Sequence, residues 1–368
     1  MKADGFHLNR IFEDDFKSLL LAQRPLIDVR SEIEFAEGHL PNAINIPILN
    51  TEERIRVGTK YKQHGQDAAV TLGHELISGE KKQARLKKWT NFIKENPMTV
   101  IYCFRGGKRS QITQAWLKEI GIDVPIIDGG YKKVRQYLIS QIEELSLKVD
   151  FLLISGVTGN AKTKLLRSLK TEAQVIDLES LANHRGSAFG YKGETPTQIN
   201  FENHLALDLI RQSENISVSR NNLVLLEDES RLIGPSIIPD VFFRKMRSSE
   251  VVIVQEDLQF RVNEIFQSYV ADEITVQGDF LFDRFLQSLE QIQKKLGGTR
   301  YQEIKKDILF SRHEFKQNNH LHSNKIWIQK LLIYYYDPIY LESLKRRAVV
   351  KKFVGTFLEC RQFLNSLF

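Results

Sequence analysis

The stretch MTVIYCFRGGKRS, residues 98–110, decides the fold of the first part of the chain. Residues 98–103 form a short apolar run that is typical of a buried strand, and residues 104–108 contain two glycines and predict a turn. The pattern from residue 109 to about residue 120 predicts a helix. A strand, a glycine-containing turn and a helix in this order indicate one step of an α/β fold with a parallel sheet.

Segments on either side of this stretch repeat the alternation. PLIDVR at residues 25–30 predicts a buried strand, and residues 40–48, with two prolines, predict a loop that leads into an edge strand. Residues 81–96 have the apolar spacing of a helix, and residues 124–127 predict a strand that ends at Gly129-Gly130. We therefore expect a parallel sheet with helices on both faces in this part of the chain.

A second alternation of strands and helices follows residue 148. Residues 149–155 predict a strand, which leads through a glycine-bearing loop into a helix from Lys162. Three further strands are expected, at residues 174–178, 222–227 and 251–255.

The predicted fold class is therefore α/β with two domains. The first domain covers residues 1–140 and the second covers residues 148–368, with a boundary in a helix and polar connection over residues 131–149. From about residue 258 the pattern is helical and charged, so we expect a helical C-terminal region within the second domain.

Composition excludes several classes of protein. A chain of 368 residues with only two cysteines is neither a disulfide scaffold nor a four-cysteine metal protein. The apolar runs are far shorter than the roughly 20 residues that span a bilayer, and the N-terminus has no apolar signal core, so we expect a cytoplasmic protein without a membrane partner. The net charge of +6 and basic clusters near residues 81–88, 132–135 and 345–352 are compatible with an RNA partner.

Cys103 lies at the start of a loop suited to bind an anion. In the pattern Cys-x5-Arg, which ends at Arg109, backbone N–H groups can surround one tetrahedral anion. Gly106 and Gly107 would allow the tight turn, and Arg105 and Arg109 add positive charge. Such a field lowers the pKa of a thiol, so we expect a thiolate at Cys103. The alternative is a cysteine that only packs at a strand end.

The second domain contains a loop for phosphate groups. GVTGNAKT at residues 156–163 follows a predicted strand and opens a helix, which is the context of a Walker-type loop. Gly156 and Gly159 would let backbone N–H groups surround a diphosphate, Lys162 would neutralise it, and Thr163 would hold Mg²⁺. The alternative is an ordinary strand–turn–helix junction.

One residue departs from the Walker pattern. Ala161 occupies a position where the pattern has glycine, and a positive φ there would cost about 1–2 kcal/mol. The sequence thus supports phosphate binding more strongly than nucleotide hydrolysis. The apolar strand over residues 223–226 ends in Glu227 and Asp228, which are candidate metal ligands if they lie beside this loop.

The first domain resembles the rhodanese family over roughly residues 8–140. The resemblance is carried by DVRS at residues 28–31, by GHLPNA at residues 38–43 and by Gly129-Gly130. It implies sulfur or selenium chemistry at Cys103. The Cys103 loop is one residue longer than the common sulfurtransferase loop and has the size found in cysteine phosphatases of related fold. A phosphatase joined to a kinase-like domain is therefore a rival interpretation. We expect Asp28 and Arg30 to form an ion pair that supports the loop.

Nearly the whole chain resembles the tRNA 2-selenouridine synthase family. The resemblance is carried, with CFRGGKRS at residues 103–110, by ANHRGSAFG at 182–190, EDESRLIG at 227–234 and YYDP at 335–338. It implies a transfer RNA substrate with 2-thiouridine at the wobble position, namely the Lys, Glu and Gln acceptors. It also implies transfer of a geranyl group from geranyl diphosphate to the sulfur, followed by replacement with selenium from selenophosphate.

Residue roles follow from this resemblance as expectations. Cys103 would receive or direct selenium, and no tightly bound cofactor is expected. The phosphate loop would hold a diphosphate, either that of geranyl diphosphate or that of a nucleotide. A non-catalytic RNA-binding module is a second rival, and the oligomeric state stays open. The expected sites are selenophosphate at Arg105, Gly106, Gly107 and Arg109, diphosphate at Gly156, Gly159, Lys162 and Thr163, and cleft or RNA contacts at His184, Arg185 and Arg231.

Overall fold

A computed structural model describes residues 9–169, 173–185, 189–190, 193–219, 222–345 and 349–368. The chain forms two units that are not contiguous in sequence. The first, here called the cysteine unit, comprises Met1–Glu144 and Pro196–Arg211. The second, here called the P-loop unit, comprises Leu145–Thr195 and Gln212–Phe368.

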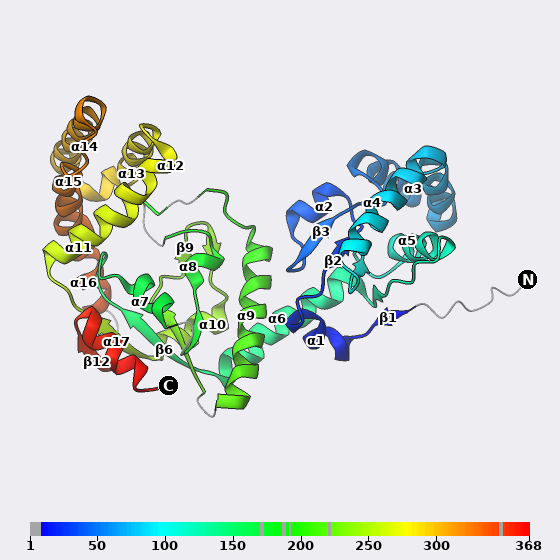
Figure 1. Cartoon of the computed structure of the whole chain (residues 1–368), viewed down its shortest axis with the longest axis horizontal. Helices are drawn as coiled ribbons and strands as arrows, with labels where there is room; N and C mark the ends of the chain where they lie inside the picture. The colour runs from blue at the N-terminus through cyan, green and yellow to red at the C-terminus, as the bar shows by residue number, and fades with distance from the viewer. Residues whose placement is uncertain (1–8, 170–172, 186–188, 191–192, 220–221, 346–348) are drawn as a thin grey trace, which may run out of the picture. The chain divides into compact units, whose positions relative to one another are not determined.

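The cysteine unit is built on a parallel sheet with the strand order β1-β5-β4-β2-β3. Its central strand β4 is completely buried, as the apolar sequence predicts. Cys103 follows β4 directly and so lies at the carboxyl end of the sheet, of which Figure 1 labels β1, β2 and β3. The strands are β1 (Arg10–Ile11), β2 (Leu26–Asp28), β3 (Ala43–Asn45), β4 (Val100–Tyr102) and β5 (Ile126–Ile127).

Helices cover the sheet of this unit, and those before residue 79 were not predicted. The long helix α3 (Thr51–Leu76) bends at Gly65, whose φ is +81°. Helix α6 (Gly130–Lys148) is continuous, so the expected polar connection is wrong. It continues because its inner positions, such as Val134 and Leu138, are buried and no proline interrupts them. The other helices are α1 (Phe16–Leu21), α2 (Glu32–Glu37), α4 (Gly79–Glu95) and α5 (Lys108–Glu119).

The P-loop unit contains a second parallel sheet with the order β12-β11-β6-β8-β7. Strand β12 lies within the region expected to be helical throughout, so that expectation is wrong at this point. Two lysines at its start are exposed, as is usual on an edge strand. The strands are β6 (Asp150–Ser155), β7 (Gln174–Ile176), β8 (Leu223–Glu227), β11 (Glu250–Val254) and β12 (Lys351–Gly355).

Shorter elements connect these strands. Helix α7 (Lys162–Ser168) follows β6, and α8 (Leu178–Leu181) follows β7. Helix α9 (Gln198–Ser219) belongs to the cysteine unit as far as Arg211 and to the P-loop unit beyond it. The remaining elements are the hairpin β9 (Leu232–Ile233) and β10 (Ser236–Ile237), and the helices α10 (Asp240–Arg247) and α17 (Phe357–Asn365).

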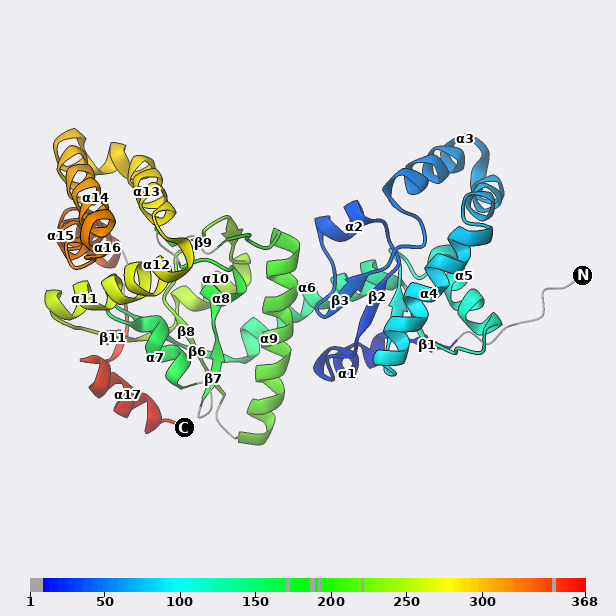
Figure 2. The same cartoon turned by 45° about the horizontal axis from the view of Figure 1, so that its top comes forward.

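The chain segment that connects β11 to β12 forms a helical layer with a hydrophobic core of its own. Its aromatic centre includes Phe282, Phe285 and Trp327, and Figure 2 shows α13, α14 and α15 gathered together. No helix in the described part of the chain is long and apolar enough to cross a membrane. The layer consists of α11 (Leu258–Ile265), the π-helix η2 (Phe266–Ala271), α12 (Asp272–Gln277), α13 (Phe280–Leu296), α14 (Gly298–Asn318), α15 (Asn324–Leu331), the π-helix η3 (Leu332–Tyr336) and α16 (Asp337–Lys345).

Candidate functional site

The loop after β4 is shaped by two glycines that pack back to back. Gly106 has φ +62°, and Gly130 has φ +59°. A Cβ atom on Gly130 would lie 2.3 Å from the carbonyl oxygen of Cys103 and 2.4 Å from the backbone nitrogen of Gly106. Gly130, quoted above for its resemblance, therefore has a physical reason: the backbone after β5 approaches the cysteine loop too closely for any side chain. Gly129 is favoured for another reason, its φ of +69°.

Gly107 differs from Gly106. Its φ is −92° with an extended ψ, a conformation open to any residue, so the expectation that both glycines allow the turn is wrong for Gly107. A Cβ atom at Gly107 would meet nothing within 4 Å. The loop thus needs glycine at position 106 for its backbone, while position 107 borders open space.

The thiol of Cys103 lies at the base of the loop. The residue is only 3% exposed, and its Sγ atom lies 3.2 Å from the hydroxyl of Ser110. That hydroxyl in turn donates a hydrogen bond to the carbonyl oxygen of Gly107 at 3.1 Å. Ser110 therefore belongs to the site, although we assigned it no role from the sequence. A serine one turn into the helix after the loop is the signal for it.

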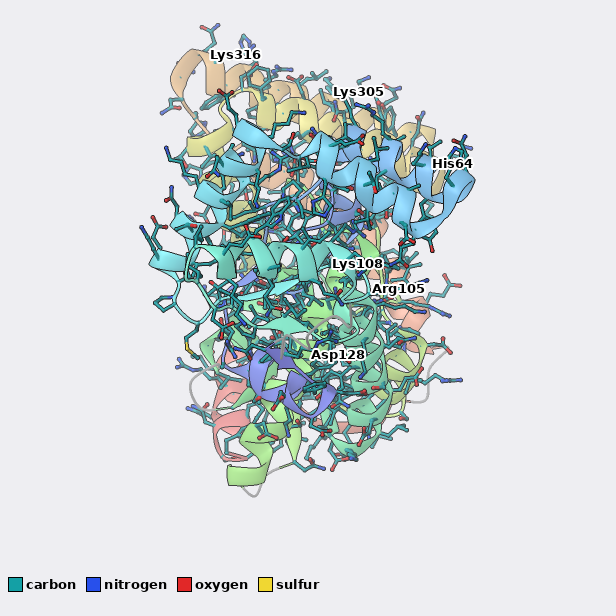
Figure 3. The ribbon with its side chains drawn as sticks, turned by 90° about the vertical axis from the view of Figure 1, so that its right-hand side faces the viewer. His64, Arg105, Lys108, Asp128, Lys305 and Lys316 are labelled. Carbon is teal, nitrogen blue, oxygen red and sulfur yellow. The ribbon has the colours of Figure 1, made fainter. Side chains whose placement is uncertain are left out.

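The two arginines of the loop have different surroundings. Arg109 binds both carboxylate oxygens of Glu34, at 2.6 and 3.1 Å. Burial raises the pKa of Glu34, but the hydrogen bonds and charge of Arg109 outweigh it and lower that pKa to about 2. Arg105 is exposed, and Figure 3 labels it beside Lys108 at the start of α5. Arg109 therefore positions the loop through Glu34, while Arg105 faces solvent.

The ion pair between Asp28 and Arg30 is confirmed. The guanidinium lies 2.6 Å from the carboxylate, and both side chains are almost completely buried. Arg30 also donates a hydrogen bond to the carbonyl oxygen of Gly38 at 2.7 Å and lies over the ring of Tyr131, 4.1 Å from its centroid. Because Tyr131 follows Gly130 directly, this pair supports the segment on which the cysteine loop rests.

The second candidate site is the loop between β6 and α7. Gly156 and Gly159 have φ values of +143° and +89°, so both glycines are required by the backbone. The ammonium group of Lys162 donates a hydrogen bond to the carbonyl oxygen of Gly156 at 2.9 Å and so lies across the loop. The side chain of Asn160 donates one to Val254 at 2.5 Å, which fixes the loop to the end of β11. This backbone arrangement is compatible with the predicted diphosphate site, which stays a prediction.

Ala161 adopts the left-handed conformation, with φ +55° and ψ +30°. The positive φ considered in the sequence analysis is therefore present, and it costs about 1–2 kcal/mol. The residue is 9% exposed and is the N-cap of α7, whose first residue is Lys162. Strain stored at this position is held by the surrounding loop.

Three carboxylates gather beside the phosphate loop. One ligand atom each of Glu179, Glu227 and Glu229 lies within 4.8 Å of the others, and the hydroxyl of Thr163 donates to Glu179 at 3.2 Å. Burial, followed by the charges of Glu179 and Glu229, raises the pKa of Glu227 well above its usual value. Burial likewise raises the pKa of Glu229 to about 7.

This cluster fits a hard divalent cation. Oε1 of Glu227 is buried without a hydrogen-bond partner among the described residues, and carboxylate and hydroxyl oxygens are the ligands that Mg²⁺ takes. Asp228 lies apart from the cluster. It accepts a hydrogen bond from Ser155 at 2.7 Å and faces Arg247 at 3.3 Å. Of the two acids expected from the sequence, the structure brings Glu227 to the loop, and it adds Glu179 and Glu229.

Each of the three polar residues expected in a cleft or at an RNA contact packs against or pairs with another part of the protein. The ring of His184 packs against Gly234, at which a Cβ atom would lie 2.6 Å from it. Arg185 pairs with Glu273 at 2.9 Å, and Arg231 pairs with Asp240 at 2.9 Å on an exposed hairpin. The neighbouring motif residues Gly186, Ser187 and Ala188 lie outside the described residues, as do Arg346 and Arg347 of the last basic cluster.

Arg261 is a site residue that the sequence analysis missed. Its Nε atom donates to the carbonyl oxygen of Thr158 in the phosphate loop at 2.9 Å, and its other nitrogens bind Asp337 at 2.5 and 3.1 Å. The available signal was Asp337 in the YYDP motif, because a buried arginine needs such a partner. Cys360 is buried in the core beside β11, and burial raises its pKa to about 11, in keeping with a packing role.

A cysteine loop at the end of a strand of one parallel sheet and a glycine-bearing loop between β6 and α7 of another define the class: a two-unit α/β protein that combines rhodanese-like and P-loop architecture. Family models agree, with the rhodanese-like domain matching residues 13–137 and the tRNA 2-selenouridine synthase AAA domain matching residues 149–367. The α/β fold class with its helical C-terminal region is thereby confirmed.

Curated relatives cover nearly the whole chain. The tRNA 2-selenouridine synthase of Nitrosomonas europaea is 46% identical over 96% of this chain and 97% of its own. That of Bdellovibrio bacteriovorus is 45% identical over 98% and 99%, and that of Shewanella oneidensis is 40% identical over 96% and 94%. The chain belongs to the tRNA 2-selenouridine synthase family.

Proposed function

We propose that this protein converts 2-thiouridine to 2-selenouridine at the wobble position of transfer RNA, in the cytoplasm. The proposal is supported by two separate loops, at Cys103 and at Lys162, whose backbone geometry suits anions, in a chain of this family. One loop suits a single tetrahedral anion and the other suits a diphosphate. By resemblance, the acceptors are the transfer RNAs for Lys, Glu and Gln.

The first step of the proposed reaction is alkylation of sulfur. The thiocarbonyl sulfur attacks the first carbon of geranyl diphosphate, a C–S bond forms, the C–O bond to the diphosphate breaks, and the N3 proton of the base is lost to water. The leaving group is an anion whose charge Lys162 and the N–H groups of the loop after Gly156 would neutralise. Thr163 and Glu227 would hold Mg²⁺, which supplies further neutralisation of the diphosphate when bound.

The second step replaces sulfur by selenium. Alkylation converts the sulfur into a good leaving group, so a selenium nucleophile adds to C2 of the base and geranylthiol departs. Selenophosphate supplies this nucleophile through its selenium atom. Water then cleaves the P–Se bond, which releases phosphate and leaves selenium on C2. Selenium in selenophosphate is already at the selenide level, so this route needs no oxidant, whereas a perselenide on Cys103 would need one. We therefore assign Cys103 to directing selenium at the base of the anion loop.

Arg105 and the backbone around Gly106 and Gly107 would bind the selenophosphate in this scheme. Arg105 is exposed, so its charge is available to an anion from solvent. Arg109 is engaged by Glu34, so its part is to hold the loop in shape rather than to approach the anion first. The proposal thus divides the two arginines between binding and positioning.

The test is mass spectrometry of the wobble nucleoside after incubation of 2-thiouridine-bearing transfer RNA with geranyl diphosphate and selenophosphate. We expect 2-selenouridine with the native protein, the geranylated nucleoside with Cys103→Ala, and unchanged 2-thiouridine with Lys162→Ala. An unchanged nucleoside with the native protein contradicts the proposal. Release of phosphate from an aryl phosphate by the same preparation would then favour the cysteine phosphatase interpretation.

A further inference from the structure

A small apolar cavity lies beside the phosphate loop of the P-loop unit. Thr158 of the loop forms part of its wall, and the other lining residues are aliphatic or aromatic, with Ile265 and Tyr269 on one side and Trp327 and Tyr336 on another. Trp327 is only 2% exposed and belongs to the aromatic core of the helical layer. The cavity therefore joins a phosphate-binding loop directly to an apolar interior.

The helices α11 and α15 each continue into a π-helix where they line the cavity. The π-helix η2 contains Tyr269, and the π-helix η3 ends at Tyr336. π-Helical turns are rare, and they concentrate at functional sites because the extra residue in the turn displaces side chains from their regular positions. Two of them facing one cavity indicate that its shape serves ligand binding and not only packing.

Arg261 ties the loop to both walls of the cavity. It lies on α11, the helix that precedes η2. It binds Asp337, the residue that follows η3, and it also donates to the carbonyl oxygen of Thr158. A Cβ atom on Gly159 would lie 3.0 Å from the Cβ atom of Arg261. The end of the cavity that faces the loop is consequently fixed, while the tyrosines at Tyr269 and Tyr336 are only partly buried.

We infer that this cavity binds the hydrocarbon tail of an isoprenoid diphosphate whose phosphate groups lie in the loop. The inference deepens the proposed function and rests on the diphosphate role of the loop. A nucleotide base or ribose would lose its hydrogen bonds to water in such surroundings, at a considerable cost. A hydrocarbon tail loses none and gains from leaving water. The lining thus selects the geranyl donor over a nucleotide, a choice that the sequence left open.

The volume of the cavity, about 30 Å³, sets a condition on this inference. That volume is close to the space of one water molecule, so a ten-carbon tail enters only if partly buried side chains turn outward. The tail would then displace Tyr269 or Tyr336 and change the surroundings of Trp327. Because the other two tryptophans, Trp89 and Trp116, belong to the cysteine unit, fluorescence of Trp327 reports on this cavity.

The experiment measures the binding of inorganic diphosphate, dimethylallyl diphosphate, geranyl diphosphate and ATP to the full-length protein by calorimetry and tryptophan fluorescence. We expect affinity to rise with tail length, and geranyl diphosphate to bind at least about tenfold more tightly than inorganic diphosphate. Geranyl diphosphate should alter the fluorescence, and the change should vanish in Trp327→Phe. Inorganic diphosphate should leave the fluorescence nearly unchanged.

Matched variants separate the cavity from the loop. Ile265→Phe fills the cavity and should abolish the advantage of geranyl diphosphate while inorganic diphosphate still binds. Ile326→Phe makes the same substitution on an exposed position of α15, where Ile326 is 47% exposed, and should change neither affinity. Retained binding of inorganic diphosphate by Ile265→Phe also shows that this variant is folded. If it does not fold, the tail-length series and Trp327→Phe still decide the matter.

Different failures have different meanings. If inorganic diphosphate binds but the tail adds no affinity, or the added affinity survives Ile265→Phe, the cavity assignment is overturned and the diphosphate role of the loop stands. If ATP alone changes the fluorescence of Trp327, the cavity takes a nucleotide base and the inference is again overturned. If neither diphosphate binds the native protein, the proposed function of the loop fails together with the inference.

Discussion

At the scale of single residues, both loops depend on backbone positions that tolerate few side chains. Gly106 and Gly130 pack against each other under Cys103, and Ala161 occupies a left-handed position at the start of α7. The first pair follows the rule that close backbone contacts require glycine. Ala161 departs from that rule. Removing its methyl group by substitution with glycine therefore tests how much strain the phosphate loop contains at this position.

Replacement of this methyl group should stabilise the protein. Ala161→Gly relieves about 1–2 kcal/mol of left-handed strain and loses roughly 0.5–1 kcal/mol to the greater freedom of glycine in the unfolded chain. We expect a net gain of about 0–1.5 kcal/mol in the free energy of unfolding, measured with urea. Ala115→Gly, at an exposed position of α5, is the control and should lose about 1 kcal/mol. Equal losses in both variants contradict the strain at Ala161.

Substitution by alanine should destabilise the protein at Gly130 but not at Gly107. Gly130→Ala places a Cβ atom 2.3 Å from the carbonyl oxygen of Cys103, so we expect a loss of about 3 kcal/mol or more and a displaced loop. Gly107→Ala meets open space at a negative φ and should leave the unfolding free energy within about 0.5 kcal/mol. Comparable losses in urea denaturation would show that the packing described for Gly130 is wrong.

The pair Glu34–Arg109 predicts a loss of stability in acid. The pKa of Glu34 is lowered to about 2 in the folded protein from a usual value of 4.5. The carboxylate therefore stabilises the fold fully above pH 4.5, and this contribution is lost as the pH falls towards 2. The shift corresponds to about 3 kcal/mol at most. Glu34→Gln should flatten the pH dependence of unfolding in this window, whereas Glu95→Gln, at an exposed position of α4, should retain it.

At the scale of elements, the junctions between strands and helices were predictable and their partners were not. The strands before Cys103 and before Gly156 follow from short apolar runs, and glycine marks both loops. The sequence does not show which side chain from a distant segment completes a site. Glu34 lies on α2, 75 residues from Arg109, and Glu179 lies on α8, 16 residues from Thr163. Such contacts are set by packing of the whole sheet and leave no local pattern.

The carboxylates beside α7 predict a response to Mg²⁺ at this scale. If Glu227 binds the ion, Mg²⁺ at ten times its dissociation constant should add about 1.4 kcal/mol to the free energy of unfolding. Glu227→Gln should abolish this gain. Asp228→Asn should retain it, because Asp228 pairs with Ser155 and Arg247 outside the cluster. A gain that Asp228→Asn removes and Glu227→Gln preserves would reverse the assignment of the metal ligand.

At the scale of the whole molecule, sequence order and spatial units differ. Residues 196–211 belong to the cysteine unit, although the chain on both sides of them belongs to the P-loop unit. Asn200 accepts a hydrogen bond from the backbone of His39 at 2.9 Å, and Asn203 donates one to its carbonyl oxygen at 2.7 Å. Asparagines spaced along a helix give no sign in the sequence of such partners. The sequence pattern therefore predicts the two sheets but not this exchange of a segment.

The central claim is that the two loops perform successive steps on one nucleoside. Its most direct test supplies transfer RNA that already carries the S-geranylated nucleoside, together with selenophosphate, to Lys162→Ala and to Cys103→Ala, and follows the product by mass spectrometry. We predict that Lys162→Ala forms 2-selenouridine from this substrate, since the step that it lacks is already complete, while Cys103→Ala leaves the geranylated nucleoside unchanged. Selenation by Cys103→Ala, or none by Lys162→Ala, would contradict the division of the reaction between the two loops.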